Sequence, residues 1–204
     1  MIKNIIFDWS GVIKDSVEDH LFAVNKVFQF FGVRQMSLKE LKEEWIQPHM
    51  MFYNKYLPAL SSKQQTVVYK KAIMERVPKA YQNIAVLIKE LQANNIKMVV
   101  ISSDLVETIT SELVIFGLNG VFLEVISNVH DKVESVKSLI NKYNFNKTET
   151  VIIGDTNHEI EVGKLVGIST VAVTWGFTSE TRLALNSPNF IIHNLRELKN
   201  LLIV

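Results

Sequence analysis

Two apolar segments, far apart in the chain, each stop at an aspartate. Residues 5–7 lead into Asp8, and residues 151–154 lead into Asp155. An unbroken apolar run is typical of a strand that is buried on both faces of a parallel sheet. An acid at the carboxyl end of such a strand lies where open α/β sheets bind ligands. The two aspartates therefore predict a paired-carboxylate site for a hard cation such as Mg²⁺.

Strands and helices alternate over most of the chain. The segments between the later apolar runs have helical spacing, as in residues 80–94, where positions 84, 87, 88 and 91 are apolar. This alternation predicts an α/β fold with a parallel sheet and helices on both faces. The expected strands are residues 2–8, 97–102, 121–126, 150–154 and 169–174, with 190–192 as a candidate further edge strand. The expected helices that accompany them are residues 80–94, 105–116, 133–143, 159–166 and 195–202.

The connection between the first two expected strands is too long for a crossover. A crossover needs a dozen or more residues, and roughly sixty lie here. Residues 16–77 contain no convincing strand, but they contain helical patterns at 18–31, 38–45 and 63–74. We expect residues 16–77 to form an inserted helical cap domain. Residues 1–15 and 78–204 would then form the α/β core domain.

Composition narrows the class of protein. The hydrophobic fraction of 48% supports a substantial core, and the net charge of +1 gives no basic face for a nucleic acid. The absence of cysteine excludes disulfides, thiolate metal sites and thiol nucleophiles. No targeting segment or membrane span is recognisable. We expect a cytoplasmic monomer or homodimer with neither a nucleic acid nor a membrane as partner.

The first motif surrounds Asp8. A carboxylate that follows a buried strand can act as a nucleophile or as a metal ligand. Taken alone, such an aspartate is more often a turn residue or a helix cap. Gly11 would permit a sharp turn and the close approach of a ligand.

The second motif follows the strand at residues 97–102. The Ser102 hydroxyl and nearby backbone N–H groups at a helix start can hold an anion, which predicts a phosphate contact. Ser103 is a further candidate for substrate binding. The simpler interpretation of Ser103 and Asp104 is that one of them caps the following helix.

Lys132 and Glu159 complete the set of candidates. Lys132 precedes a helical run and could bind phosphate as a point charge while offsetting carboxylate repulsion, although most lysines are solvated. Glu159 follows Asp155 by four residues, in the first turn of a helix. It could join the metal site or simply interact favourably with the helix N-terminus.

The order of these motifs resembles the haloacid dehalogenase (HAD) superfamily of hydrolases, and most closely its phosphoglycolate-phosphatase-like branch. The residues that carry the resemblance are the run 8–12, Ser102, Lys132 and the run 154–159, with 173–177 similar to the loop after the fifth strand. Each motif is weak alone, but four in order at the ends of four expected strands make a strong signal. The resemblance implies a Rossmann-like five-stranded parallel sheet in the order 5-4-1-2-3. Asp8 and Asp155 would then leave adjacent strands.

The resemblance also implies a reaction. Asp8 would attack the phosphorus of a small phosphate monoester and form an aspartyl-phosphate, with Mg²⁺ bound alongside. The implied metal ligands are Asp8, the backbone carbonyl of Ser10, Asp155 and, directly or through water, Glu159. The implied catalytic residues are Asp8, Ser10, Ser102 and Lys132, and the implied substrate-binding residues are Trp9, Gly11, Ser102, Ser103 and Lys132.

Ser10 departs from the pattern, because family phosphatases carry an aspartate there as general acid and base. A serine hydroxyl is a poor proton acceptor near neutral pH, and loss of a positioned acid–base group typically costs about 10²–10⁴-fold in rate. The favoured interpretation is a phosphatase that is slow, or one whose substrate has a leaving group that needs little protonation. The alternatives are an impaired member that binds a phosphorylated ligand or a protein, a phosphonatase-type enzyme, and a dehalogenase-type enzyme. Ser10 could also be an engineered substitution that traps an intermediate.

The cap is expected to determine which substrate binds. Trp45, His49, Tyr53 and Lys55 form a polar and aromatic group within it. The aromatic residues are expected to pack in the cap core, because Trp and Tyr at helical spacing usually do. His158, next to the second aspartate motif, is expected to face solvent or to support its loop.

Overall fold

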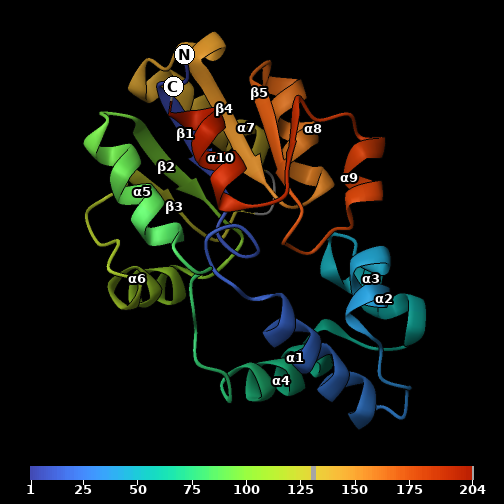
Figure 1. Cartoon of the computed structure of the whole chain (residues 1–204). Coiled ribbons are helices and arrows are strands. Elements are labelled where there is room, and N and C mark those ends of the chain that lie inside the picture. The colour runs from blue at the N-terminus through green and yellow to red at the C-terminus, as the bar shows by residue number, and fades with distance from the viewer. Residues whose placement is uncertain (130–131, 204) are drawn as a thin grey trace.

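A computed structural model describes residues 1–129 and 132–203 (Figure 1). Its centre is a six-stranded sheet in the order β3-β2-β1-β4-β5-β6, in which all neighbouring strands are parallel. The strands are β1 (Asn4–Phe7), β2 (Lys97–Ile101), β3 (Glu124–Ile126), β4 (Thr150–Gly154), β5 (Ser169–Val173) and β6 (Phe190–Ile192).

Helices cover both faces of this sheet. Alternate residues of β1 face opposite layers: Ile5 and Phe7 pack in one buried cluster and Ile6 in another. The first cluster includes residues of α5, α6 and α10, and the second includes residues of α7 and α8. The core helices are α5 (Ile84–Ala93), α6 (Val106–Ile115), α7 (Lys132–Tyr143), α8 (Asn157–Val166), α9 (Glu180–Leu185) and α10 (Leu195–Leu202), with a 3₁₀ turn at Lys147–Glu149.

The predicted α/β class, parallel sheet and two helical layers are confirmed. The five-stranded sheet implied by the resemblance is one strand short, because the candidate edge strand at residues 190–192 forms as β6 and pairs with β5. The predicted third strand is also too long, since residues 121–123 form a turn and a bend before β3 begins at Glu124. The predicted order 5-4-1-2-3 is kept within the larger sheet.

Four helices lie between β1 and α5, where the cap was expected, and we call them the cap helices (Figure 1). They are α1 (Val17–Phe30), α2 (Leu38–Glu44), α3 (His49–Tyr56) and α4 (Ser62–Ile73), and they enclose their own buried cluster. Capping boxes start α2 and α4, where Ser37 pairs with Glu40 and Ser61 with Gln64. The sequence analysis missed α3, which follows Pro48 and has no side-chain cap to mark its start.

The two connections to these helices run side by side. The Asp15 amide donates to the Lys79 carbonyl at 2.9 Å, and the Tyr81 amide donates to the Ile13 carbonyl at 3.0 Å. These bonds lie next to the expected domain boundaries, after residue 15 and before residue 78, which stay a prediction. Every helix within the described residues is too short or too polar to cross a bilayer.

Candidate active site

The two aspartates that end apolar runs lie together. β1 and β4 are neighbours, with Phe7 opposite Ile153, so Asp8 and Asp155 leave adjacent strands at the same sheet edge. Glu159 in the first turn of α8 joins them, and one carboxylate oxygen from each residue lies within 4.8 Å of the others. The sheet order thus brings three buried acids to the topological switch point.

Lys132 binds two of these acids. Its Nζ lies 2.6 Å from Asp8 Oδ1 and 2.7 Å from Glu159 Oε1, and its side chain is only 7% exposed. Burial alone would lower the pKa of Lys132, but the charges of Asp8 and Glu159 outweigh it and raise that pKa above its usual value. Lys132 is the first residue of α7, and its ammonium is held charged inside the site.

The acids themselves are unequally charged. Burial, opposed by Lys132, raises the pKa of Asp8 to about 7, and the charges of Glu159 and Asp104 add to the rise. Burial and the charges of Asp8 and Glu159 raise the pKa of Asp155 well above its usual range. Burial would also raise the pKa of Glu159, but Lys132 outweighs it and lowers that pKa. One buried lysine is therefore too little positive charge to keep all three acids ionised, and the pKa values of Asp8 and Asp155 are raised.

The donor set fits a hard divalent cation. Asp155 Oδ2 accepts a hydrogen bond from the Phe177 amide at 2.6 Å. Asp155 Oδ1 is buried and has no hydrogen-bond partner within the part of the chain that the structure describes. A buried carboxylate oxygen without a partner is costly unless a charge compensates it. Mg²⁺ is bound by oxygen ligands of this type.

Gly11 has a packing reason to be glycine. Its φ is +84°, and a Cβ there would overlap the Asp155 carboxylate and contact the Phe177 ring. The close approach predicted for Gly11 is therefore to Asp155, a candidate metal ligand, and not only to a substrate.

The second motif differs from its prediction. α6 begins at Val106, and its N-cap residue Leu105 has no side-chain capping bond, so neither Ser103 nor Asp104 caps it. Ser103 is exposed, whereas Ser102 is buried directly after β2. The Asp104 carboxylate instead lies over the first motif, where its Oδ2 accepts a hydrogen bond from Ser10 Oγ at 2.6 Å. The sequence analysis missed this role, and the available signal was an acid three residues beyond the end of β2.

Trp9 does not present its side chain to a substrate. The indole is fully buried, donates from Nε1 to Glu112 Oε2 at 2.7 Å, and stacks on Phe116 with ring centroids 5.7 Å apart. Both partners belong to α6 or its C-terminal end. The expected substrate contact of Trp9 can come only from its backbone.

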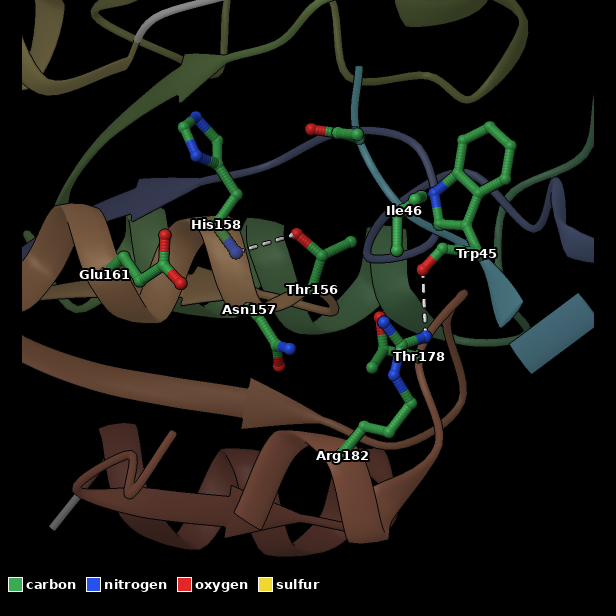
Figure 2. Close-up of a pocket in the computed structure, with 9 residues that line it drawn as sticks. Trp45, Ile46, Thr156, Asn157, His158, Glu161, Thr178 and Arg182 are labelled. Atoms are coloured by element: carbon green, nitrogen blue, oxygen red, sulfur yellow. Dashed lines mark hydrogen bonds between the residues drawn. The ribbon is translucent and has the colours of Figure 1, made fainter. Parts of the chain in front are cut away.

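A pocket of about 190 Å³ lies where the cap helices meet the loops after β4 and β5 (Figure 2). Arg182 connects α9 to the end of α2 beside this pocket. Its Nη1 donates to the carbonyls of Trp45 at 2.8 Å and Lys42 at 3.1 Å. His158 lines the pocket, and its buried Nε2 has no hydrogen-bond partner among the described residues. His158 was expected to face solvent or to support its loop, and it is half-buried at the edge of this pocket.

The cap candidates divide as expected for the aromatic residues. Trp45 and Tyr53 pack in the buried cluster of the cap. Lys55 forms an ion pair with Glu44, and His49 is exposed. None of these four carries a role that the geometry assigns to catalysis.

Comparisons with known proteins agree with this geometry. Residues 5–173 match the family described as haloacid dehalogenase-like hydrolase. The chain is 22% identical over 205 residues to pyrophosphatase PpaX of Halalkalibacterium halodurans, covering 97% of this chain and 95% of that protein. It is 24% identical over 200 residues to pyrophosphatase PpaX of Listeria welshimeri, covering 95% and 86%.

Solved structures share the fold. A predicted phosphatase from Clostridium acetobutylicum superposes with a TM-score of 0.80 at 19% identity, covering 100% of this chain and 99% of that one. A predicted phosphoglycolate phosphatase from Haemophilus somnus gives a TM-score of 0.76 at 16% identity, covering 98% and 97%. The family match spans the motifs at Asp8, Ser102, Lys132 and Asp155, and the resemblance inferred from those motifs is confirmed. The chain belongs to the haloacid dehalogenase-like hydrolases.

Proposed function

We propose that this hydrolase is a Mg²⁺-dependent phosphatase that uses Asp8 as its nucleophile. The observation that carries the proposal is the pairing of Lys132 with Asp8 and Glu159, beside the unpartnered oxygen of Asp155. A buried lysine and surplus carboxylates suit a reaction that consists mostly of positioning and neutralising phosphoryl charge. The relatives named pyrophosphatases and phosphatases support the same chemistry.

Each residue has a role in this proposal. Mg²⁺ would be held by Asp8, Asp155, Glu159 and the backbone carbonyl of Ser10, and when bound it would neutralise developing charge on the phosphoryl oxygens. An oxygen of Asp8 forms a bond to phosphorus while the bond to the leaving group breaks, and the leaving group takes the electron pair. Lys132 and the Ser102 hydroxyl bind phosphoryl oxygens, with Ser103 and the backbone of Trp9 and Gly11 as further candidate contacts.

The substrate is proposed to be a small phosphorylated metabolite whose leaving group needs little protonation. Ser10 supplies no carboxylic acid to protonate an alkoxide. A phosphoanhydride releases a phosphate, which carries negative charge stably and needs no such acid. The name of the pyrophosphatase relatives agrees with this preference, and the near-neutral charge of the chain favours a small substrate over a nucleic acid.

Hydrolysis of para-nitrophenyl phosphate and of pyrophosphate, with Mg²⁺ and with chelator, tests the proposal. We expect Mg²⁺-dependent release of phosphate from both, with pyrophosphate preferred, and no release by Asp8→Asn. Equal rates for Asp8→Asn and the parent would overturn the proposal. Tight phosphate binding without turnover would instead favour the second candidate, an impaired phosphate-binding member, which the serine at position 10 supports.

A further inference from the structure

Residue 10 carries no carboxylate, but the carboxylate of Asp104, in the loop after β2, is hydrogen-bonded to it. Ser10 Oγ donates to Asp104 Oδ2 at 2.6 Å, a distance typical of a hydrogen bond from a hydroxyl to a charged carboxylate. Asp104 follows β2 and Ser10 follows β1, so two neighbouring strand ends bring the pair together.

Asp104 differs from the other half-buried and buried aspartates and glutamates near the connections to the cap. Asp15 pairs with Lys79, Asp19 with Arg76, and Glu112 with Lys14. The Asp104 carboxylate forms no ion pair with any described residue. Its partners are hydroxyls: Ser10 at 2.6 Å and Ser102 at 3.3 Å. Within the described part of the chain, its negative charge thus has no cation beside it, and the carboxylate is directed at the Ser10 hydroxyl.

The backbone already holds this loop in place. The Asp104 amide donates to Ser102 Oγ at 3.1 Å, and the Asp104 carbonyl accepts from the Asn128 amide at 2.8 Å. The carboxylate is not required for these two bonds. Its reach toward Ser10 therefore calls for a reason other than loop geometry.

We propose that Ser10 and Asp104 together form a proton relay that activates the water which hydrolyses the phosphoryl group on Asp8. The inference rests on the proposed function and names a further residue of the same site. Ser10 touches the water, and Asp104 is the positioning residue that orients the serine hydroxyl and takes up its proton. A general base is effective within hydrogen-bond reach of the proton it removes, directly or through one water, and here the Ser10 hydroxyl takes the place of that bridging water.

The step balances without a further reactant. The water oxygen forms a bond to phosphorus, and the bond between phosphorus and the Asp8 oxygen breaks, leaving its electron pair on the Asp8 carboxylate. One proton of the water passes to Ser10 Oγ as the Ser10 hydroxyl proton passes to Asp104 Oδ2. Asp104 is partly exposed, so this proton can leave to solvent after phosphate departs.

The first test is Asp104→Asn, with Glu107→Gln as the matched control. Asparagine keeps the shape of the side chain and can still hydrogen-bond, but it cannot take up a proton. We expect pyrophosphate turnover to fall by about 10²-fold or more, within the range typical of a lost general base. Phosphorylated Asp8, trapped by acid quench and measured by mass spectrometry, should accumulate above its level in the parent. Glu107 is an exposed carboxylate three residues further on, and its variant should match the parent in both measurements.

The second test is rescue. Ser10→Asp in the Asp104→Asn background places a carboxylate at residue 10 without a like charge beside it, and it should restore turnover to the parent level or above. Ser10→Asp alone should raise turnover less than it does in the Asp104→Asn background, because its carboxylate would then lie at hydrogen-bond distance from the Asp104 carboxylate. The effects of Ser10→Ala and Asp104→Asn should be non-additive, since the two residues act as a unit.

The outcomes separate the two proposals. A parent enzyme that forms no phosphorylated Asp8 would overturn the proposed function, and the relay with it. A parent that forms the intermediate, with Asp104→Asn turning over at the parent rate, would overturn the relay alone. Slower turnover with less phosphorylated Asp8 and a lower melting temperature would show that Asp104 only holds the structure, and this too would overturn the relay.

Discussion

Titratable side chains are buried in two regions of the molecule. In one region they surround a charged lysine, and in the other a histidine is kept neutral. At the sheet edge, the buried Lys132 ammonium lies 2.6 Å from Asp8 Oδ1 and 2.7 Å from Glu159 Oε1. In the cap, His20 is buried among aromatic rings, with Trp45 at 4.4 Å and Phe177 at 5.1 Å between ring centroids. Burial, with the nearby His49, lowers the pKa of His20 to about 3, so this imidazole is neutral.

The difference reflects what each region must do. A phosphoryl-transfer site needs fixed charges in a dry environment, where they act more strongly than in water. The interior of the cap needs only to pack, and burial favours the neutral form of a titratable group over its charged form. Phe177 joins the two regions, because its amide donates to Asp155 while its ring lies in the cap cluster.

The largest expected effect concerns chemistry at the sheet edge. Asp8→Asn removes the proposed nucleophile, and we expect turnover to fall by at least about 10⁴-fold, as for other lost nucleophiles. The cap change Trp45→Phe should alter kcat far less, because Trp45 packs in the cap cluster. Steady-state phosphate release measures both. A similar loss in both variants would break the distinction between a reactive core and a packing cap.

The next effect concerns stability. Lys132→Met leaves Asp8 and Glu159 without their cation, and breaking a buried ion pair typically costs about 3–5 kcal/mol. Arg76→Met removes the partner of Asp19 in the cap, but Arg76 is 41% exposed, so we expect a loss of about 1 kcal/mol or less. Urea unfolding without Mg²⁺ gives both values. Equal losses would mean that the buried charges at the sheet edge are not special.

Mg²⁺ should stabilise the protein through the sheet edge alone. A ligand that binds only the folded state adds about 2.7 kcal/mol to the free energy of unfolding at 100 times its Kd. We expect Mg²⁺ to raise the Tm of the parent and of His20→Phe, but not that of Asp155→Asn. Thermal unfolding with and without the cation measures this. A shift retained in Asp155→Asn would place the cation elsewhere.

The smallest effect is the pH dependence, where the two regions have opposite signs. The folded-state pKa of His20 is lowered, so the unfolded chain binds a proton that the folded protein does not, and stability falls as pH drops below 6.5 toward about 3. The loss approaches about 1.4 kcal/mol per pH unit. The folded-state pKa of Asp8 is raised, so its contribution is present below 3.8 and is lost as pH rises through about 7.

Two variants separate these contributions in Mg²⁺-free buffer. His20→Phe should lose less stability than the parent between pH 6.5 and about pH 4.5. Asp8→Asn should lose more over the same range, because it no longer gains a stabilising proton. Urea midpoints at several pH values report both slopes. Parallel pH profiles for the parent and both variants would contradict the pKa shifts of these two groups.

The sequence alone predicted the class of fold and named most of the residues that the structure brings to the candidate site. Apolar runs that end at Asp8 and Asp155 encode buried parallel strands, because burial on both faces leaves a continuous apolar signal. The strand β4 and the helix α10 lie where the patterns predict them, whereas α3 lacked a capping signal and was missed. Ser102 and Lys132 could be named as candidates because Ser102 follows a strand and Lys132 begins a helix.

Which polar groups meet depends on the sheet order and on how the helices pack. Ser10 and Asp104 are 94 positions apart, and no local pattern relates them, because their contact depends on the order of β1 and β2 in the sheet. The burial of Trp9 under α6 was equally invisible, since a tryptophan after a strand can face either the site or a covering helix. Local periodicity encodes where strands end, whereas sheet order and helix packing determine what lies beside each end.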